Sequence, residues 1–335
     1  MKNLVFISII AALTVLMSCS EDDVLSGSVS GDRILNDFFV TSIKFDNSGN
    51  AWIGTFKQGV IKYNDRKSTL FNSSNSPLDG VVVNSIAIDS KNNIWIGANG
   101  LVKYDGKEFK LYNNENTPIP ENYIHSINID KDDNIWFSSS RHMTGGVVKF
   151  DGNNKWNTFI YKDTESGIEG CIISGIAIAG DNVWAGIQTS DNNHLMKISS
   201  NNETTYIGND QGLEAYSLGR LCADKNSNVY MIHDYSYSSA LVFNDGPHLF
   251  VTDGKSINAI TCPYGEINLI NTDSKGNLWC VRSFNSRVLL RYNGKEWVDF
   301  NIIREDEDNT IFCIEEAPDG KIWLGTGKGI YIIDV

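Results

Sequence analysis

Positive charge is scarce in this sequence of 335 residues. Lys and Arg number 28 against 41 Asp and Glu, which gives a formal net charge of −13 at pH 7. A surface that binds the phosphate backbone of nucleic acid needs clustered Lys and Arg. The composition therefore argues against nucleic acid as a partner.

Proline and helical periodicity are scarce as well. Six Pro accompany 29 Gly, a balance that suits a chain with many tight turns. No stretch has apolar residues at a sustained 3.6-residue spacing with capping residues at its ends. Hydrophobic residues still make up 41% of the chain, which is enough for a packed core. We expect a folded protein with essentially no helix.

The six cysteines show no C-x-x-C pair and no zinc-ligand spacing. One, Cys19, follows an apolar N-terminal run. The remaining five are Cys171, Cys222, Cys262, Cys280 and Cys313. Five is an odd number, and most of them stand among strand-forming apolar residues, where a free thiol behaves as a small hydrophobe. We expect core cysteines, no metal and no disulfide framework.

No apolar run reaches the roughly 20 residues that span a bilayer. Residues 4–17 are a weakly polar to apolar run behind Lys2, which suits the apolar part of a signal peptide. The run ends in Leu16-Met17-Ser18-Cys19, which resembles a bacterial lipobox, and an acidic stretch at 20–23 resembles the surface-export signal of Bacteroidetes lipoproteins. We therefore predict a signal peptide at 1–18, lipidation of Cys19 and a tether at 19–32. An ordinary secretory signal with an incidental cysteine is the alternative.

One pattern repeats along the rest of the chain: an apolar strand, a turn rich in Asp, Asn and Gly, and an aromatic residue within a second strand. The aromatic residues are Trp52, Trp95, Trp136, Trp184, Tyr230, Trp279 and Trp323. Their spacings are 43, 41, 48, 46, 49 and 44 residues. A period in the forties with only strand signals inside it is typical of propeller blades. We predict an all-β fold, a seven-bladed β-propeller of four-stranded antiparallel blades, over residues 33–335.

The second copy shows four strand signals, at 81–88, 94–97, 101–104 and 109–112. Asp105-Gly106 marks the turn between the last two. The seventh copy ends after its third strand, at Val335. We therefore predict that the segment 28–36 pairs there and closes the ring, because an open edge would invite aggregation. The recurring Trp is read as a structural filler between blades.

The pattern resembles the two-component regulator propeller repeat. It is clearest from Asp46 to Tyr63, from Asp89 to Tyr104 and from Asp319 to Tyr331. Such repeats form extracytoplasmic sensor regions of Bacteroidetes hybrid histidine kinases. The chain carries no kinase or receiver segment, so the resemblance implies a stand-alone, membrane-anchored relative of those sensor regions.

The motifs of catalysis are absent. Asp130-Lys131-Asp132-Asp133-Asn134 lacks the Gly and Glu of a calcium loop, and the five His show no metal-ligand spacing. No Gly-x-Ser-x-Gly or His-Glu-x-x-His motif occurs. We predict no catalytic residues and no cofactor. Distant blades can still build a site together, so a propeller lyase or hydrolase stays open.

The loops between the second and third strands are the predicted ligand site. They are short in copies one, two and seven, and longer in copies three to six, with Tyr, Phe, Arg and His that can stack on or donate to a ligand. In copy three the predicted loop is 138–143, which begins with Ser138, Ser139 and Ser140. The candidates are Arg141, His142, Asp191, His194, His233, Tyr235, Tyr237, Arg282, Phe284 and Arg287. The alternative is simple drift of loop length.

Together these features predict an outer-membrane lipoprotein at the cell surface. We expect a non-catalytic, sensor-like module for a glycan or small ligand. A scaffold for another envelope protein is the second possibility.

Overall fold

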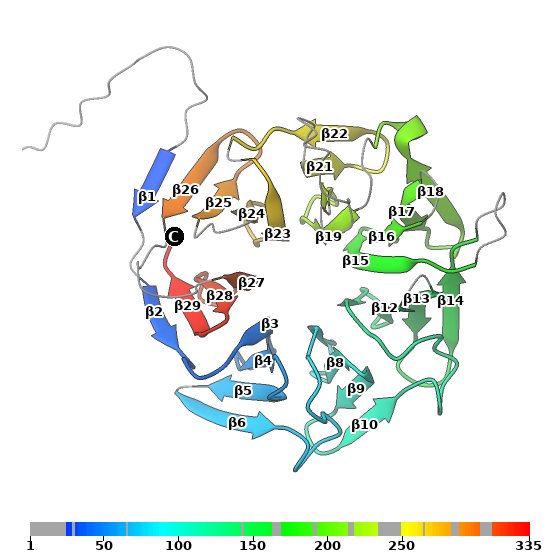
Figure 1. The fold of residues 1–335 in the computed structure, drawn as a ribbon, viewed down its shortest axis with the longest axis vertical. Helices are drawn as coiled ribbons and strands as arrows, with labels where there is room; N and C mark the ends of the chain where they lie inside the picture. Colours follow the sequence, from blue (N-terminus) through cyan, green and yellow to red (C-terminus); the bar gives the residue numbers. More distant parts are fainter. Residues whose placement is uncertain are drawn as a thin grey trace, which may run out of the picture.

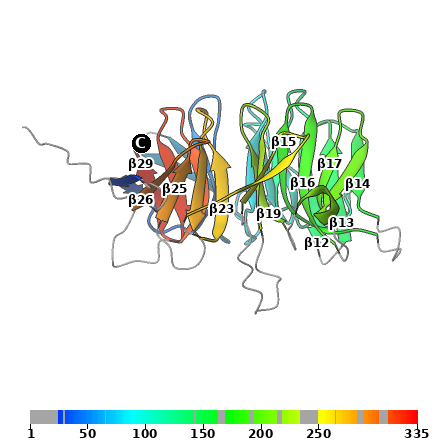
Figure 2. The same cartoon turned by 90° about the horizontal axis from the view of Figure 1, so that it is seen from above.

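The computed structural model describes eleven stretches of the chain. They are residues 25–28, 31–64, 66–141, 144–162, 169–189, 193–213, 218–233, 249–263, 265–282, 288–301 and 310–335. These residues form seven β-sheets arranged as a ring around a central axis (Figures 1 and 2). The predicted seven-bladed β-propeller is confirmed.

Each blade has four strands that follow one another from the axis to the rim. Blade one contains β3 (Val40–Phe45), β4 (Ala51–Thr55), β5 (Val60–Asn64) and β6 (Lys67–Phe71). Blade two contains β7 (Ser85–Ile88), β8 (Ile94–Ala98), β9 (Gly100–Tyr104) and β10 (Phe109–Tyr112). Blade three contains β11 (Ile127–Ile129), β12 (Ile135–Arg141), β13 (Thr144–Phe150) and β14 (Trp156–Ile160).

Blades four to seven continue the pattern. Blade four contains β15 (Ile172–Ala179), β16 (Asn182–Gln188), β17 (Asn193–Ile198) and β18 (Thr204–Gly208). Blade five contains β19 (Leu218–Ala223), β20 (Val229–His233), β21 (Leu249–Thr252) and β22 (Ile257–Ile260). Blade six contains β23 (Ile267–Thr272), β24 (Leu278–Arg282), β25 (Val288–Tyr292) and β26 (Trp297–Asn301). Blade seven contains β27 (Ile311–Glu316), β28 (Ile322–Thr326) and β29 (Gly329–Ile333).

The fourth strand of blade seven comes from the other end of the chain. β2 (Gly31–Ile34) pairs antiparallel with β29, with Gly31 opposite Ile333 and Ile34 opposite Ile330. This is the pairing expected of the segment 28–36, and it joins the first and last parts of the propeller in one sheet. A second N-terminal strand, β1 (Leu25–Ser28), adds in parallel to β26 at the rim of blade six, which the sequence did not indicate. Both strands begin inside the segment expected to be a tether.

The described residues contain one short 3₁₀ helix, Asn209–Gln211, and are otherwise strands and turns. No helix among them has the length and apolar character to cross a membrane. The cysteines that the model describes are free, and Cys171, Cys222 and Cys280 are buried. Burial raises the pKa of the Cys171 thiol to about 12, so it stays protonated and inert. The core role expected of these cysteines holds for the buried ones.

The hydrophobic core lies between neighbouring blades. In one cluster, Trp52 of blade one packs with Ile86, Ile94 and Ile96 of blade two. Trp52 is 2% exposed and Trp95 is 1% exposed. The large flat side chains fill the wedge between adjacent sheets, as expected for the recurring Trp.

An aspartate turn holds each of these indoles in place. Asp46 accepts a hydrogen bond from Trp52 Nε1 at 2.9 Å, from the backbone N–H of Asn50 at 2.9 Å and from that of Ser48 at 3.0 Å. Burial opposes ionisation of Asp46, but the hydrogen bonds from Trp52 and Asn50 outweigh it and lower its pKa. The carboxylate thus closes the turn and satisfies the buried indole at once.

The same clamp recurs with different members around the ring. Its Asp–Trp pairs are Asp46–Trp52, Asp89–Trp95, Asp130–Trp136 and Asp273–Trp279. In blade five the donor is the hydroxyl of Tyr230, bonded to Asp224, and burial raises the pKa of Tyr230 to about 12. In blade seven the residue six positions before Trp323 is Ala317. Asp319 accepts from the backbone N–H of Lys321 and lies 3.9 Å from its ammonium group. It is therefore not the counterpart of the other clamp aspartates, although the sequence pattern placed it there.

Blades seven and one are also joined by an ion pair beside the axis. Lys44 of β3 lies 2.7 Å from Glu315 Oε2 of β27, and its second contact, to Oε1, is 2.9 Å. Asn271 of β23 donates to the carbonyl of Ile314 at 2.7 Å, so blade six is tied to the same strand. Burial raises the pKa of Glu315, although Lys44 works against that rise.

Replacing the clamp aspartate should destabilise the ring. Asp46→Ala leaves a buried indole N–H and the Asn50 side chain without their acceptor, so the free energy of unfolding should fall by about 2–3 kcal/mol. Asp319→Ala, on an exposed turn without that indole bond, is the matched control and should change stability by less than about 0.5 kcal/mol. The pKa of Asp46 is lowered, so its contribution is present above its ordinary pKa of 3.8 and is lost in acid. Denaturant titration at pH 7 and pH 3 measures this; equal losses for both variants would contradict it.

The ion pair between Lys44 and Glu315 gives two predictions of opposite sign, one for each partner. Lys44→Met leaves a carboxylate that is only 16% exposed without its cation and should cost about 1–2 kcal/mol, less than in a fully buried pair because Lys44 is 41% exposed. Glu315→Gln removes the charge that burial disfavours and should be at least as stable as the wild type at pH 7. The raised pKa means that wild-type stability falls as pH rises above the ordinary value of 4.5, so the advantage of Glu315→Gln should grow from pH 4 to pH 7. A constant difference across this range would contradict the assignment.

Candidate functional site

The two edges of the ring carry different loops. The second strand of each blade ends opposite the start of the innermost strand, as Thr55 does opposite Val40. The loops between second and third strands therefore lie beside the segments that cross from blade to blade, and isolated bridges join them at Phe56–Val82 and Asn99–Tyr123. We call this edge the crossing face. The opposite edge carries the aspartate turns.

The four predicted site residues that the structure describes all lie at the crossing face. Arg141 ends β12, and His233 and Arg282 end β20 and β24, opposite the first residues of β19 and β23. His194 lies at the start of β17. They belong to four different blades, from three to six, so their shared feature is the face. The remaining candidates, His142, Asp191, Tyr235, Tyr237, Phe284 and Arg287, lie outside the described residues, as does Cys19.

Exposure separates these four residues into two pairs. Arg141 and Arg282 are exposed at strand ends, where a guanidinium can meet a ligand. His194 is 4% exposed and His233 is 7% exposed, because both stand within strands that pack in the blade interior. The two arginines thus suit direct ligand contact better than the two histidines do.

Blade three corrects the predicted loop boundary. Ser138, Ser139 and Ser140 were expected in a recognition loop, but they are buried residues of β12. Ser139 Oγ donates to the carbonyl of Glu121 at 2.6 Å and accepts from its N–H. Ser140 Oγ accepts from the N–H of Ile173 in the next blade. Three polar residues in a row look like a loop in sequence, yet here their hydroxyls satisfy the backbone of the crossing segments.

Aromatic side chains at the crossing face were missed by the sequence reading. Phe56 and Tyr123 are each 43% exposed. Phe39 lies between Phe56 and Phe312, with ring centroids 5.2 and 4.5 Å apart. These residues come from blades one, three and seven and flank short loops. The candidate ligand residues were chosen only from the longer loops, so these aromatic residues beside short loops went unnoticed.

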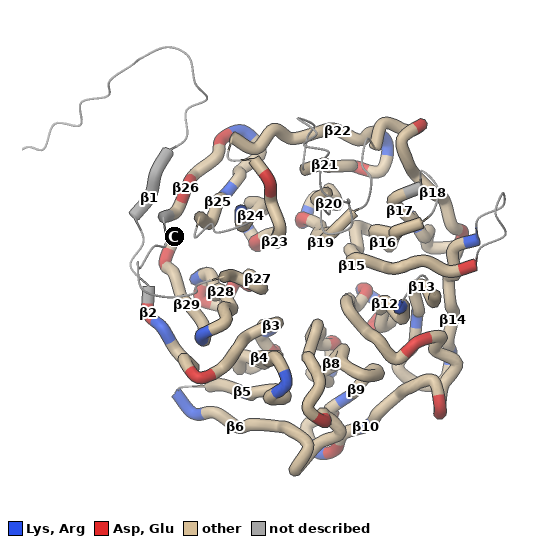
Figure 3. Tube along the Cα trace, in the orientation of Figure 1, with Lys and Arg blue, Asp and Glu red and all other residues tan. Residues whose placement is uncertain are grey.

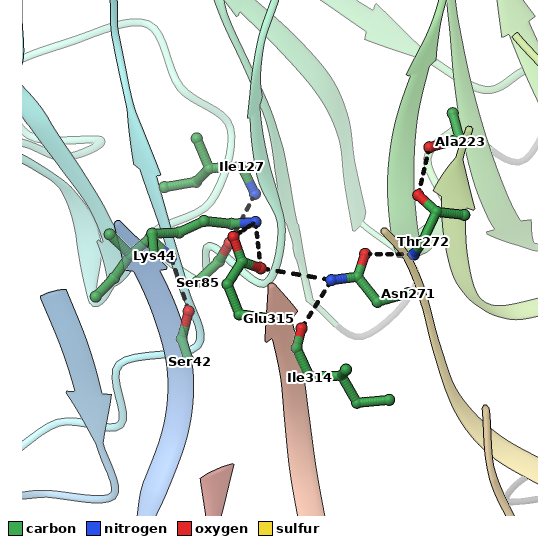
Figure 4. Close-up of polar contacts among 10 residues, drawn as sticks. Ser42, Lys44, Ser85, Ile127, Ala223, Asn271, Thr272, Ile314 and Glu315 are labelled. Atoms are coloured by element: carbon green, nitrogen blue, oxygen red, sulfur yellow. Dashed lines mark hydrogen bonds and ion pairs between the residues drawn. The ribbon is translucent and has the colours of Figure 1, made fainter. Parts of the chain in front are cut away.

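A cavity of about 490 Å³ lies on the ring axis. Its lining comes from all seven blades, including Ser42, Ser85, Asn128, Arg220 and Asn271. Figure 4 shows the Lys44–Glu315 pair and the amide of Asn271 at this wall. Ser42 and Ser85 each accept a backbone N–H from the following blade, at 3.2 and 3.1 Å. The wall is therefore polar and built from contacts between blades.

The charges along this cavity are few. The innermost strands are almost uncharged (Figure 3), and within them only Lys44, Arg220, Glu315 and Glu316 are ionisable as acids or strong bases. No group of three or more His, Cys, Asp or Glu suited to a metal ion occurs in the described part of the chain. The site can offer hydrogen bonds and charge to a polar ligand, and its buried thiols are not nucleophiles at neutral pH.

Similarity to solved structures shows the fold. The extracellular domain of a putative one-component system from B. thetaiotaomicron has 18% identity and a TM-score of 0.68, over 91% of this chain and 41% of that one. The extracellular domain of a putative hybrid two-component system from the same organism has 17% identity and a TM-score of 0.65, over 89% and 39%. This chain thus spans about two fifths of those sensor domains. Virginiamycin B lyase from Staphylococcus aureus has 15% identity and a TM-score of 0.70, over 92% of this chain and 99% of the lyase.

No curated protein matches the chain. The model of the two-component regulator propeller matches three of its segments, residues 77–100, 118–141 and 306–328. Each segment contains the second strand of its blade, which is β8, β12 or β28. The chain is a propeller in which three blades carry segments that match the two-component regulator propeller repeat.

Proposed function

We propose that this protein is a membrane-anchored surface lipoprotein that binds a glycan or small ligand at the crossing face of blades three to six. The observation that carries the proposal is the common placement of Arg141, His194, His233 and Arg282 at that one face. Repeats of this type and a similar fold occur in extracellular sensor domains, which supports a sensor-like role outside the cytoplasm.

Binding without catalysis is favoured by the chemistry of the described residues. The thiols of Cys171 and Cys313 have pKa values raised to about 12 by desolvation, and His194 and His233 are buried. A lyase or hydrolase is the less favoured reading, supported by the similarity in fold to virginiamycin B lyase. Turnover of a bound glycan would favour it instead.

The place where the N-terminal segment joins the ring suits a lipid anchor. Leu25 begins β1 at the rim of blade six, six residues after Cys19. A fully extended chain of that length reaches about 20 Å. A lipid on Cys19 would therefore hold the rim close to the bilayer and leave the crossing face accessible from the side.

A protein partner is the second candidate function. Phe56 and Tyr123 are exposed aromatic residues at the crossing face, and aromatic residues are enriched where proteins bind one another. A pull-down from envelope extract with Phe56→Ser and wild-type protein would separate this function from glycan binding.

Removing the exposed arginines should weaken ligand binding. Arg141→Ala and Arg282→Ala should each reduce the affinity for the glycan found on an array by about tenfold or more, since a hydrogen bond to a charged group is worth about 1.5–3 kcal/mol. Their melting temperatures should stay close to that of the wild type. Lys328→Ala, an exposed residue in the short loop of blade seven, is the charge-matched control and should bind normally. Unchanged affinity in both arginine variants would reject the site.

Removing the predicted lipid should release the protein. Cys19→Ala should move it from the membrane fraction to the soluble fraction, because a lipid chain is the expected anchor. Cys262→Ala, which changes a thiol elsewhere in the chain, should remain in the membrane fraction. If Cys19→Ala still sediments with membranes after a salt wash, the lipobox interpretation is wrong.

A further inference from the structure

The four charged residues on the innermost strands differ in their partners. Lys44 and Glu315 pair with each other. Glu316 accepts from the backbone N–H of Ser274 at 2.6 Å and from its hydroxyl at 2.9 Å. No hydrogen bond or ion pair joins Arg220 to any of the residues that the structure describes. Of the four charged residues on the innermost strands, Arg220 alone has no hydrogen-bond or ion-pair partner among the described residues.

Arg220 also departs from the pattern of the ring. It lies two residues before Cys222, which pairs with Tyr230, the aromatic residue of blade five. The residues two positions before the partner of the blade aromatic are, in the other blades, Ser42, Ser85, Ser126, Gly175, Leu269 and Cys313. Six of the seven positions are thus small or apolar. An arginine among them is the one large charged group at this level of the cavity.

The neighbours of Arg220 cannot neutralise it. Arg220 interacts electrostatically with Cys313, but burial raises the pKa of that thiol to about 12, so the thiol is neutral. Arg220 itself is charged at any physiological pH, although desolvation lowers its pKa. Arg220 is an exposed residue that lines the axial cavity, so the five N–H donors of its guanidinium are accessible to a solute.

A second donor lies in the adjacent blade. The hydroxyl of Ser174 is buried and has no hydrogen-bond partner. It lines the same cavity as Arg220. The two blades approach closely here, because a Cβ on Gly175 would lie 3.5 Å from the Cα of Arg220. A native structure rarely leaves a buried hydroxyl unsatisfied unless something else binds it.

We propose that the axial cavity binds a small oxyanion, the carboxylate or sulfate group of a solute, through Arg220 with Ser174 as an additional donor. The planar guanidinium matches two oxygens of such a group. The cavity of about 490 Å³ lies within the range of small-molecule sites. This site is separate from the loops of the crossing face and does not rest on the function proposed for them.

The first test separates an anion site from a structural arginine. In low-salt chloride buffer, Arg220→Met should melt at the same temperature as the wild type or higher, because it removes an unpaired charge. Sulfate stabilises proteins in general by exclusion from their surface, so the measured quantity is the difference between variants. Added sodium sulfate should raise the melting temperature of the wild type more than that of Arg220→Met. A lower melting temperature of Arg220→Met in chloride, with equal sulfate increments, would overturn the proposal.

The second test locates the anion and measures its affinity. Crystals soaked in sodium selenate should show an anomalous peak beside Arg220 in the wild type and none in Arg220→Met. Titration calorimetry should show sulfate affinity reduced by about 10- to 100-fold in Arg220→Met, and acetate in place of sulfate tells a carboxylate site from one for sulfate alone. Lys255→Met, in an outer turn of the same blade, should bind as the wild type does. Selenate found only at surface lysines, as an adventitious ion, would reject the site.

Discussion

The wedge between radial sheets is the constraint on which this molecule depends. Seven blades around one axis leave gaps that widen outward, and each gap needs a large apolar filler with a polar edge that can be satisfied. Trp52, Trp95, Trp136 and Trp279 provide that filler, and a turn aspartate accepts the indole N–H in each case. The clamp fixes the turn, the turn fixes the register of the first two strands, and this register places every loop of a blade on a known face.

Inside the ring the same geometry creates a different problem. Innermost strands have no sheet neighbour on the axial side, so their side chains must join the blades and line the cavity together. Hydroxyls and amides perform this role: Ser42 binds the N–H of Ile86 and Asn271 binds the carbonyl of Ile314. The ion pair between Lys44 and Glu315 does so where the chain's two ends meet. These are contacts that small polar residues can make without loss, which explains why large charges are rare there.

Much of the fold could be predicted because the aspartate and the tryptophan of each clamp lie close together in the sequence. Asp89 and Trp95 lie six positions apart in the sequence and are joined by a hydrogen bond. The repetition of this pattern along the chain indicated the blades of a propeller. The site was harder to predict. Ser138 to Ser140 have the composition of a loop and the burial of a strand, since their hydroxyls bond to segments distant in sequence. Asp319 lies near the expected position, but Ala317 occupies the place of the clamp aspartate. Arg220 gave no signal because its meaning depends on six equivalent residues from other blades.

Departures from the repeat differ in their cost to the stability of the ring. A loop on the crossing face can lengthen at little cost, because its backbone meets water and each doubling of length costs only about 0.6 kcal/mol. A change in the axial wall alters contacts with two neighbouring blades and the shape of the axial cavity. Tyr230 in place of Trp keeps a donor for Asp224, so that change conserves the clamp. Arg220 supplies none of the small or apolar side chains of its six counterparts, and it places an exposed charge in the axial cavity. A residue that departs from its counterparts and makes no contact that joins the blades is better explained by what it binds, and a guanidinium in a cavity that also holds an unsatisfied hydroxyl suits an oxyanion.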